Sequence, residues 1–249
     1  MKLIAPMLVL LLIAVPAFAG VILNTLDGVG DDATGWSGGL DGSFSASGGN
    51  TDRVTLSGGG RAVWSGERDV WRLQGKMEYQ ETSSVESARS VVGHLRQNHH
   101  LVGRLHTVTF AQIQHNPFQR LQSRWLFGAG GRIDVLDDDL GSLSLGATHM
   151  MEIERIEDED GRDTDQRLSA FLFASRRLSP TVNLSAVGFI QPLWSDFSDR
   201  RAMGNLSMDV SLTGSLVLRV GGSVEYDSSP PTGVDSTDWK TSTGLGVRF

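Results

Sequence analysis

Apolar and polar residues alternate along most of the chain from residue 35 onward, with a period of two rather than 3.6. Val54, Leu56 and Trp64, for example, share one parity, and Thr55 and Ser57 share the other. This alternation predicts strands with one apolar and one polar face. About twelve such segments follow one another, each on the order of ten residues or slightly longer, the length a tilted strand needs to cross a bilayer.

The connections between these segments differ in length in a regular way. "SGERD", "LSPT" and "TG" are tight, whereas "IEDEDGRDTD", "QPLWSDFSD" and "YDSSPPTGVDSTD" are longer and polar. Short turns at one rim and longer loops at the other are typical of an outer-membrane barrel. We therefore predict an all-β fold over residues 35–249, a closed antiparallel up-and-down transmembrane β-barrel of about 12 strands. A soluble sandwich is the alternative, since its strands also alternate.

Two stretches fit the alternation poorly. The segment from Ser83 to Gln97 alternates only in part, and the parity from Arg167 to Leu178 is ambiguous because Phe171 and Phe173 fall opposite Leu168 and Leu172. A different interpretation of these stretches would change the strand count by two.

The first residues have the layout of a secretory signal peptide. Lys2 precedes an apolar run, which ends at Pro16 and the small-x-small triplet "AFA". We expect a signal peptide over residues 1–19, cleaved before Gly20, and a short periplasmic segment over residues 20–34. A retained N-terminal anchor is the alternative, although the run is short for a span.

Composition narrows the class of protein further. No long apolar run follows Gly20, which argues against a helical membrane protein. The chain has 22 basic and 29 acidic residues, and loss of Lys2 with the signal leaves the mature chain at −8, so nucleic acid is not an expected partner. The Cys count of 0 excludes disulfides and a lipoprotein anchor.

The chain ends in a short amphipathic strand that closes with an aromatic residue. Leu245, Val247 and Phe249 share one parity, opposite Gly244, Gly246 and Arg248. In lipid every backbone group needs a partner, so the last strand is expected to pair with the first. The terminal aromatic would lie in the periplasmic girdle. Such a strand resembles the signal recognised by the barrel-assembly machinery, which we expect as a partner together with periplasmic chaperones.

Four stretches carry a family resemblance: "GWSGGLDGSFSASGGNTD", "FAQIQHNPFQRLQSRWLFGAGGRI", "QPLWSDFSDRR" and "VEYDSSPPTGVDSTDWKTSTGLGVRF". They resemble domain-of-unknown-function family 481, the YdiY-like salt-induced outer-membrane proteins of Gram-negative bacteria. The resemblance spans essentially the whole mature chain. It implies an outer-membrane barrel in a bacterial outer membrane and a link to osmotic or salt stress. It implies no activity and no catalytic residues.

The histidines are the first candidates for catalysis, because an outer-membrane phospholipase needs a serine activated by a nearby histidine. No His-x-Ser pattern occurs, His149 would face lipid, and His99 and His100 fall at an expected periplasmic turn. An omptin-type protease would need Asp and His at the outer rim. His115 is expected near that rim, with Asp residues on other loops. We therefore expect that the protein is not an enzyme. The alternative is an enzyme that modifies lipid or lipopolysaccharide.

Metal and phosphate motifs are incomplete. An EF-hand alignment of "IEDEDGRDTD" puts Ile156 at the first ligand position and Arg167 at the twelfth. "GAGGR" lacks the Gly-Lys-Ser ending of a phosphate loop. We expect no metal site and no cofactor. Loose divalent bridging between the acidic loop and lipopolysaccharide phosphates is the alternative, and outer-membrane lipid and lipopolysaccharide are expected partners.

The polar parity contains many charged residues, which would face the lumen of the barrel. Two interpretations stay open: an internal ion-pair network that fills a narrow barrel, or a small pore whose arginines favour anions. We therefore expect a structural envelope protein or a narrow channel. The predicted lumen residues are Arg53, Arg61, Arg72, Arg104, Arg120, Arg124, Arg132, Arg219 and Arg248, with Asp41, Glu78, Glu152, Glu154, Asp209 and Glu225.

Overall fold

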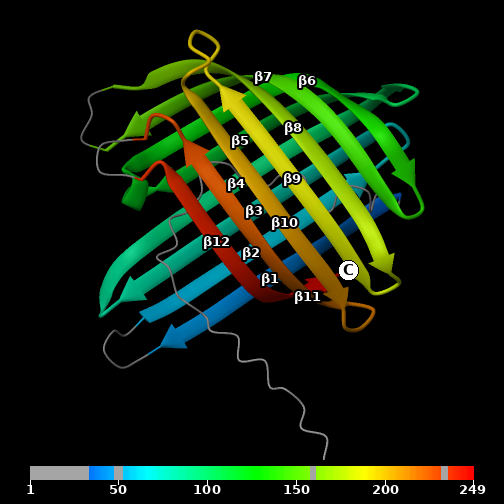
Figure 1. The fold of residues 1–249 in the computed structure, drawn as a ribbon, viewed down its shortest axis with the longest axis horizontal. Coiled ribbons are helices and arrows are strands. Elements are labelled where there is room, and N and C mark those ends of the chain that lie inside the picture. The colour runs from blue at the N-terminus through cyan, green and yellow to red at the C-terminus, as the bar shows by residue number, and fades with distance from the viewer. Residues whose placement is uncertain (1–33, 48–52, 158–160, 231–234) are drawn as a thin grey trace, which may run out of the picture.

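The computed structural model describes residues 34–47, 53–157, 161–230 and 235–249. The predicted signal peptide, the predicted periplasmic segment up to residue 33 and residues 48–52 ("GGNTD") lie outside the described residues. The described residues form twelve strands, labelled in Figure 1, and one short 3-10 helix. The strands are β1 (Gly35–Ser47), β2 (Arg53–Ser65), β3 (Asp69–Thr82), β4 (Val85–Val102), β5 (Leu105–Asn116), β6 (Leu121–Asp138), β7 (Gly141–Ile156), β8 (Asp163–Ser179), β9 (Val182–Pro192), β10 (Arg200–Ser211), β11 (Leu216–Asp227) and β12 (Thr237–Arg248), and the helix is η1 (Pro117–Gln119).

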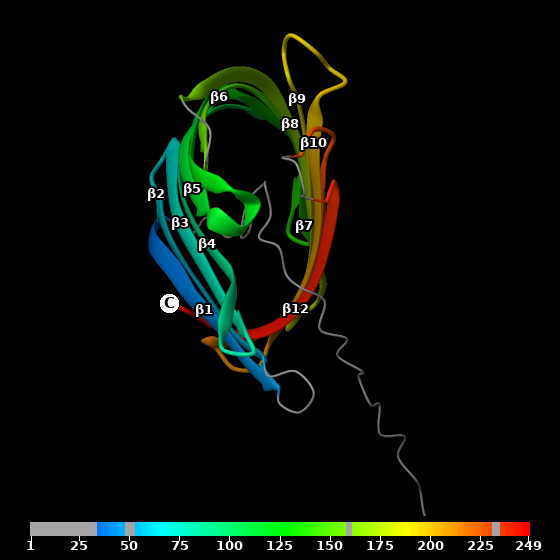
Figure 2. The ribbon, with the colours of Figure 1, turned by 90° about the vertical axis from the view of Figure 1, so that its left-hand side faces the viewer.

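The strands form one closed antiparallel sheet in which each strand pairs with its neighbours in sequence and β1 pairs with β12. At this closing seam Gly39 lies opposite Arg248 and Gly42 opposite Leu245. The Gly38 N–H donates to the Phe249 carbonyl over 2.9 Å. Figure 2 looks into the barrel and shows an elongated cross-section. The predicted twelve-stranded up-and-down transmembrane barrel is therefore confirmed.

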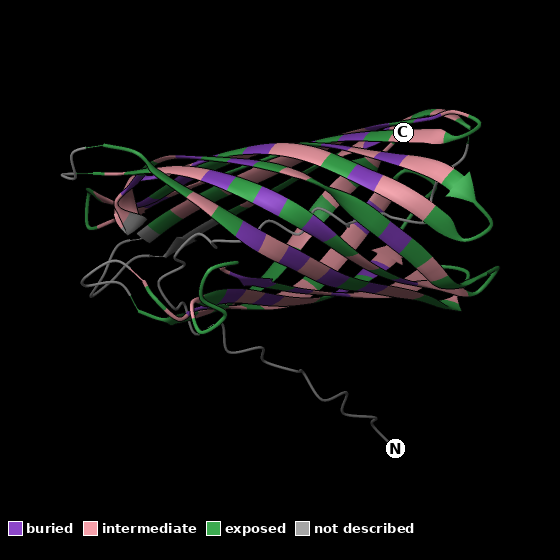
Figure 3. Ribbon diagram, turned by 90° about the horizontal axis from the view of Figure 1, so that it is seen from above, coloured by how far each residue is buried: buried purple, intermediate pink, exposed green. Residues whose placement is uncertain are grey.

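The outer face of the barrel is apolar and exposed. Buried and exposed residues alternate along the strands, as Figure 3 shows. A broad exposed apolar surface would be a liability in water, and it matches the lipid-facing band of a membrane barrel. Exposed apolar residues include Trp36, Leu40, Phe44, Leu73, Met77, Ile113, Trp125, Phe127, Leu206, Trp239 and Leu245.

The two rims differ in their connections. We define the terminal rim as the rim where β1 begins and β12 ends, and the loop rim as the opposite one. Connections at the terminal rim are short: 66–68, 103–104, 139–140, 180–181 and 212–215. The longest connections, 157–162, 193–199 and 228–236, all lie at the loop rim, as the sequence predicted.

In the described part of the chain, no helix has the length and apolar character that a helical membrane span requires.

The two stretches with unclear alternation both form regular strands. In β4, Glu86 pairs with Glu81 and Ala88 with Gln80, so Ser87 forms a bulge near the loop rim. In β8 the odd-numbered residues face inward, so Phe171 and Phe173 are buried inside the barrel rather than lipid-facing. They form an apolar cluster with inward residues of β9 and β10: Val187, Phe189 and Met203.

Candidate functional site inside the barrel

Charged side chains gather inside the barrel near the loop rim, and we refer to this group as the loop-rim cluster. It comprises three arginines (Arg124, Arg167 and Arg201) and four acids (Glu152, Glu154, Asp199 and Asp227). They come from β6, β7, β8, β10 and β11 and from the connection before β10. Each strand contributes residues close to its loop-rim end, so the cluster collects at one level of the barrel.

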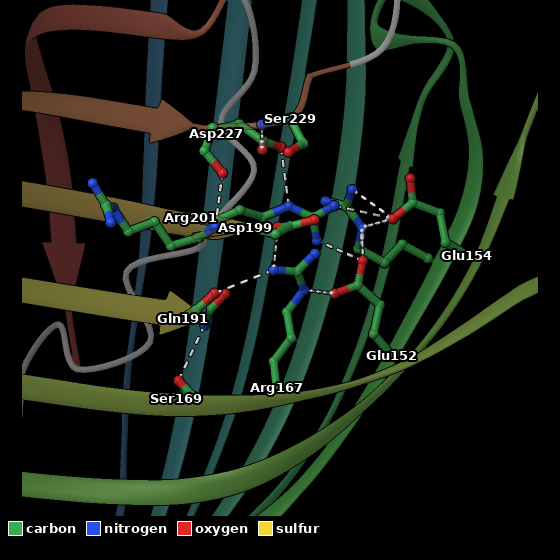
Figure 4. Close-up of polar contacts among 12 residues, drawn as sticks. Glu152, Glu154, Arg167, Ser169, Gln191, Asp199, Arg201, Asp227 and Ser229 are labelled. Carbon is green, nitrogen blue, oxygen red and sulfur yellow. Dashed lines mark hydrogen bonds and ion pairs between the residues drawn. The ribbon is translucent and has the colours of Figure 1, made fainter. Parts of the chain in front are cut away.

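Glu152 is the centre of the loop-rim cluster. Its Oε2 accepts from Arg167 Nε at 3.1 Å, and its Oε1 accepts from Arg201 Nη1 at 2.5 Å. Arg124 Nε lies 3.2 Å from the same Oε1. Figure 4 shows Arg167 and Arg201 converging on this carboxylate. Because β7 and β10 are not neighbours in the sheet, the contact between Glu152 and Arg201 ties together separate parts of the wall.

The remaining groups complete the pairing in the loop-rim cluster. Arg124 Nη2 lies 2.7 Å from Glu154, Arg167 Nη1 lies 2.9 Å from Asp199, and Arg201 Nε lies 3.0 Å from Asp227. Glu152 is only 1% exposed. A buried charge persists only when it is paired, and loss of one partner leaves the other uncompensated. The mutual pairing therefore explains how these charges can be buried inside the barrel.

A second ion-pair group lies near the terminal rim. Asp209 of β10 accepts from Arg219 of β11 through both carboxylate oxygens, at 2.6 and 2.8 Å. Arg248 Nη2 also donates to Asp209 Oδ2, at 2.5 Å. Two arginines from different strands thus contact one carboxylate near the terminal rim.

The interior wall formed by β11, β12, β1 and β2 contains small side chains. Asp41 and Ser242 belong to the inner face by register, and both are exposed. Lys76 of β3 also has the inward parity and is exposed. An inward residue that remains exposed borders on solvent within the barrel. We refer to the inner surface of β11, β12, β1 and β2 as the open wall. Its small inward residues include Gly39, Gly59, Gly221, Gly244, Gly246, Ser43, Ser57, Ser223 and Ser242.

A lysine–glutamate pair spans the same open wall. Lys240 Nζ of β12 donates to Glu78 Oε2 of β3, although β1 and β2 separate these two strands in the sheet. Asp41 lies beside Gly59 on the inner face, close to the position that a Cβ of Gly59 would take. The open wall therefore carries charges of both signs between its small residues.

The other predicted lumen residues have different positions. Arg72 is fully buried on β3, and Arg132 is buried on β6 with its Nη2 2.9 Å from Asp134. Arg61 and Glu225 are half-buried and have the inward parity of β2 and β11. Arg53 begins β2, and its side chain lies outside what the structure describes.

Two of the predicted lumen residues need correction. Arg104 is exposed in the turn between β4 and β5 and donates to the Val135 carbonyl. Arg120 follows η1 with a positive φ of 57° and donates to the Glu157 carbonyl. Both side chains satisfy backbone carbonyls at the rims, because the strands end before these positions.

Sequence reasoning missed three buried arginines: Arg96, Arg167 and Arg201. Arg96 lies in the stretch where the alternation was blurred, and Arg167 lies where inward phenylalanines hid the parity. Arg201 follows the predicted long loop "QPLWSDFSD" and was placed in no strand, but it is the second residue of β10. Its parity matches that of Ser207 and Asp209, which is the signal that could have identified it.

The histidines of the described residues contact amides, carboxylates and backbone carbonyls. His94 contacts Gln112, His99 contacts Asp69, His106 contacts Asp134, and His149 contacts Gln166. Within the described ranges, no histidine ring forms a hydrogen bond with a serine hydroxyl. The same ranges contain no group of three His, Asp or Glu residues placed to hold a metal ion.

The loop-rim connection 193–199 carries aromatic and acidic groups outside the membrane-spanning strands. Trp194 and Phe197 are exposed, with ring centroids 6.3 Å apart. The Ser198 hydroxyl and backbone N–H donate to Asp196 Oδ1 at 2.6 and 2.9 Å, which lowers the pKa of Asp196. This carboxylate is therefore ionised at neutral pH.

The sequence of this barrel matches the model of one family, described as "Protein of unknown function, DUF481", over residues 41–249. The chain belongs to this family. The match covers the barrel from the middle of β1 to the C-terminus, so the family resemblance noted in the sequence is confirmed. Among curated proteins, none matches the chain significantly.

Solved structures with a similar fold are outer-membrane barrels. The NanC porin has a TM-score of 0.51 at 11% identity, covering 86% of this chain and 98% of its own. The translocator domain of the autotransporter NalP from Neisseria meningitidis has a TM-score of 0.48 at 15% identity, covering 90% of this chain and 91% of its own. At these identities the similarity concerns the fold alone.

Proposed function

We propose that this protein is a non-enzymatic, narrow channel of the bacterial outer membrane that favours anions. Its apolar outer face suits a bilayer, and its fold resembles that of a porin. The loop rim would face the outside and the terminal rim the periplasm, following the usual arrangement of such barrels. Export through a cleaved signal peptide over residues 1–19 is part of this proposal.

The observation that carries the proposal is the exposure of inward residues on the open wall. Asp41 and Ser242 of this wall, and Lys76 of the adjoining strand β3, have inward parity but are exposed, whereas Phe173 on the opposite wall is buried. A lumen filled by side chains would bury all of them alike. The small residues of the open wall therefore support a path for water along β11, β12, β1 and β2.

Anion preference follows from the distribution of charge along this path. Near the terminal rim, Arg219 and Arg248 both contact the carboxylate of Asp209. Lys76 adds an exposed positive charge midway along β3. Arginines and lysines that line a pore attract anions and repel cations. The loop-rim cluster would act mainly as a brace that narrows the barrel, since its charges are mutually paired.

The expected partners follow from the same assignment. Trp194 and Phe197 at the loop rim would lie at the outer interface, where aromatic girdles contact lipid and lipopolysaccharide. Leu245, Val247 and Phe249 would be recognised by the barrel-assembly machinery after periplasmic chaperones deliver the chain. A role under osmotic or salt stress is a prediction from the family resemblance.

Planar-bilayer recording of the purified barrel tests the channel. We expect stepwise currents whose reversal potential in a potassium chloride gradient shifts toward the chloride equilibrium potential. Lys76→Glu should lower the anion-to-cation permeability ratio by about two-fold, because an exposed charge contributes only a fraction of a kcal/mol. Arg89→Gln, on the outer face of β4, is the matched control and should leave the ratio unchanged. Absence of current, or cation preference, would refute the proposal.

A further inference from the structure

A group of buried basic side chains lies in the half of the barrel nearer the terminal rim. Unlike the two ion-pair groups, it includes buried N–H donors that have no hydrogen-bond partner among the described residues. Arg72 and Arg96 lie directly opposite each other on β3 and β4. Arg132 of β6 is close enough for electrostatic repulsion between its guanidinium and that of Arg96. Arg96 is 2% exposed and Arg132 9% exposed. We refer to Arg96, Arg132 and the neighbouring His94 as the basic site.

Aromatic rings hold the basic site in place. The Arg96 guanidinium carbon lies 4.8 Å from the centroid of the Phe171 ring. The His94 ring stacks on Phe110, with centroids 5.4 Å apart. A guanidinium over a ring face is stabilised by the quadrupole of the ring, so Arg96 is fixed in position before any ligand binds.

Two glycines make room for these rings. A Cβ on Gly128 would lie 2.2 Å from the Phe110 ring, and one on Gly146 would lie 2.2 Å from the Phe171 ring. Any larger residue would displace the ring that supports the basic site. The inner faces of β6 and β7 are therefore shaped to accept Phe110 and Phe171.

The basic site keeps donors that no described residue uses. Arg96 donates through Nε to Asn98, and Arg132 donates through Nη2 to Asp134. Arg96 Nη2 and Arg132 Nε and Nη1 are buried and have no hydrogen-bond partner among the described residues. A buried donor without an acceptor costs about 1–3 kcal/mol, and more when it is charged. These donors indicate that an acceptor from outside the wall completes the site.

We propose that the basic site binds a compact oxyanion of the phosphate or sulfate class. A guanidinium presents N–H groups in a planar fork that matches the spacing of oxyanion oxygens. A doubly charged anion would also screen the repulsion between Arg96 and Arg132, and between Arg96 and Arg72. Lys76, four residues beyond Arg72 on the same inner face of β3, is exposed and borders on solvent inside the barrel. The inference rests on the proposed channel for the route of the anion and names a ligand class for it.

Isothermal titration calorimetry of the full barrel in detergent tests this inference. Sodium phosphate and then sodium sulfate would be titrated at constant ionic strength, with chloride as the balancing anion. We expect saturable binding of both to the wild type. Arg96→Gln should weaken binding at least about ten-fold, the loss expected for a hydrogen bond to a charged group. Arg89→Gln is the matched control, because Arg89 lies on the same strand, is exposed and pairs with Glu86, and it should bind as the wild type.

Heat-modifiable gel mobility would verify that each variant is folded, and Arg132→Gln would replace Arg96→Gln if the latter failed this check. Absence of saturable binding to the wild type would overturn the inference. Equal binding by the wild type and the folded site variant would also overturn it. A barrel that conducts anions without binding phosphate or sulfate refutes only the basic site. A barrel that binds them without conducting refutes only the channel.

Discussion

The loop-rim cluster and the basic site bury arginines in two different ways. In the loop-rim cluster, Arg124, Arg167 and Arg201 each contact a carboxylate, and Glu152 contacts all three. In the basic site, Arg96 donates to the side chain of Asn98 and lies over the face of Phe171, and it forms no ion pair among the described residues. In the first arrangement every charged side chain contacts an oppositely charged partner within the protein. In the second, buried N–H donors of Arg96 and Arg132 have no acceptor among the described residues.

This difference separates a structural role from a binding role for the same residue type. A paired buried charge becomes costly when a partner is lost, because the remaining partner is left in a poorly solvated interior. A buried arginine whose donors lack acceptors already destabilises the folded protein, so its replacement should lower the free energy of unfolding only slightly. Substitutions in the two regions should therefore differ in their effects on stability and on anion binding.

Glu152→Gln should have the largest effect on stability. The substitution removes the negative charge that contacts Arg124, Arg167 and Arg201, so we expect a loss of about 3–5 kcal/mol in the free energy of unfolding. Urea unfolding in lipid vesicles would measure the loss. Glu67→Gln, in an exposed turn, is the control and should change stability by less than about 0.5 kcal/mol. Equal stability of the two variants would contradict the structural role of the loop-rim cluster.

A pair of arginine substitutions compares the two regions directly. Arg201→Gln should cost about 3 kcal/mol, since it leaves Glu152 and Asp227 without their shared partner. Arg96→Gln should change stability by no more than about 1 kcal/mol in phosphate-free buffer, because it relieves repulsion as it removes the contact with Phe171. The same unfolding measurement applies to both. A larger loss for Arg96→Gln than for Arg201→Gln would reverse the roles assigned to the two regions.

Gly128→Ala should have a smaller effect that is confined to the basic site. The new Cβ would collide with the Phe110 ring, and we expect an overpacking loss of about 1–3 kcal/mol together with weaker phosphate binding. Gly204→Ala is the control, because a Cβ there would lie 3.5 Å from Val224, an ordinary contact. Unfolding and calorimetry would be measured on both. Unchanged phosphate binding in Gly128→Ala would show that the Phe110 ring does not support the site.

The barrel itself could be predicted from the sequence because its physical cause is local. A strand between lipid and lumen must alternate, so residues such as Leu56 and Ser57 report their faces directly. The lengths of the connections also predicted that one rim carries short turns and the other carries the longer loops. The closing of β12 on β1 followed from the need to satisfy every backbone group in lipid.

The interior could be predicted only in part, because alternation assumes that inward residues are polar. Phe171 and Phe173 face inward and belong to one apolar cluster, and Phe171 also supports Arg96; these inward aromatic residues made the parity of β8 ambiguous. In β4, the polar outward residue Arg89 and the bulge at Ser87 interrupted the alternation of apolar and polar positions in the same way. The contact between Glu152 and Arg201, from strands that are not neighbours, has no local signature in the sequence.

Thiol labelling tests the central claim, a water-filled path along the open wall, most directly. The natural chain has no Cys, so Ser242→Cys and Thr243→Cys would each place a single thiol on adjacent residues of β12 with opposite faces. In lipid vesicles, a membrane-impermeant maleimide should label the folded Ser242→Cys barrel but not the Thr243→Cys barrel, and an anionic reagent should react faster than a cationic one. A Ser242→Cys barrel that stays unlabelled until it is unfolded would show that no water-filled path runs along the open wall.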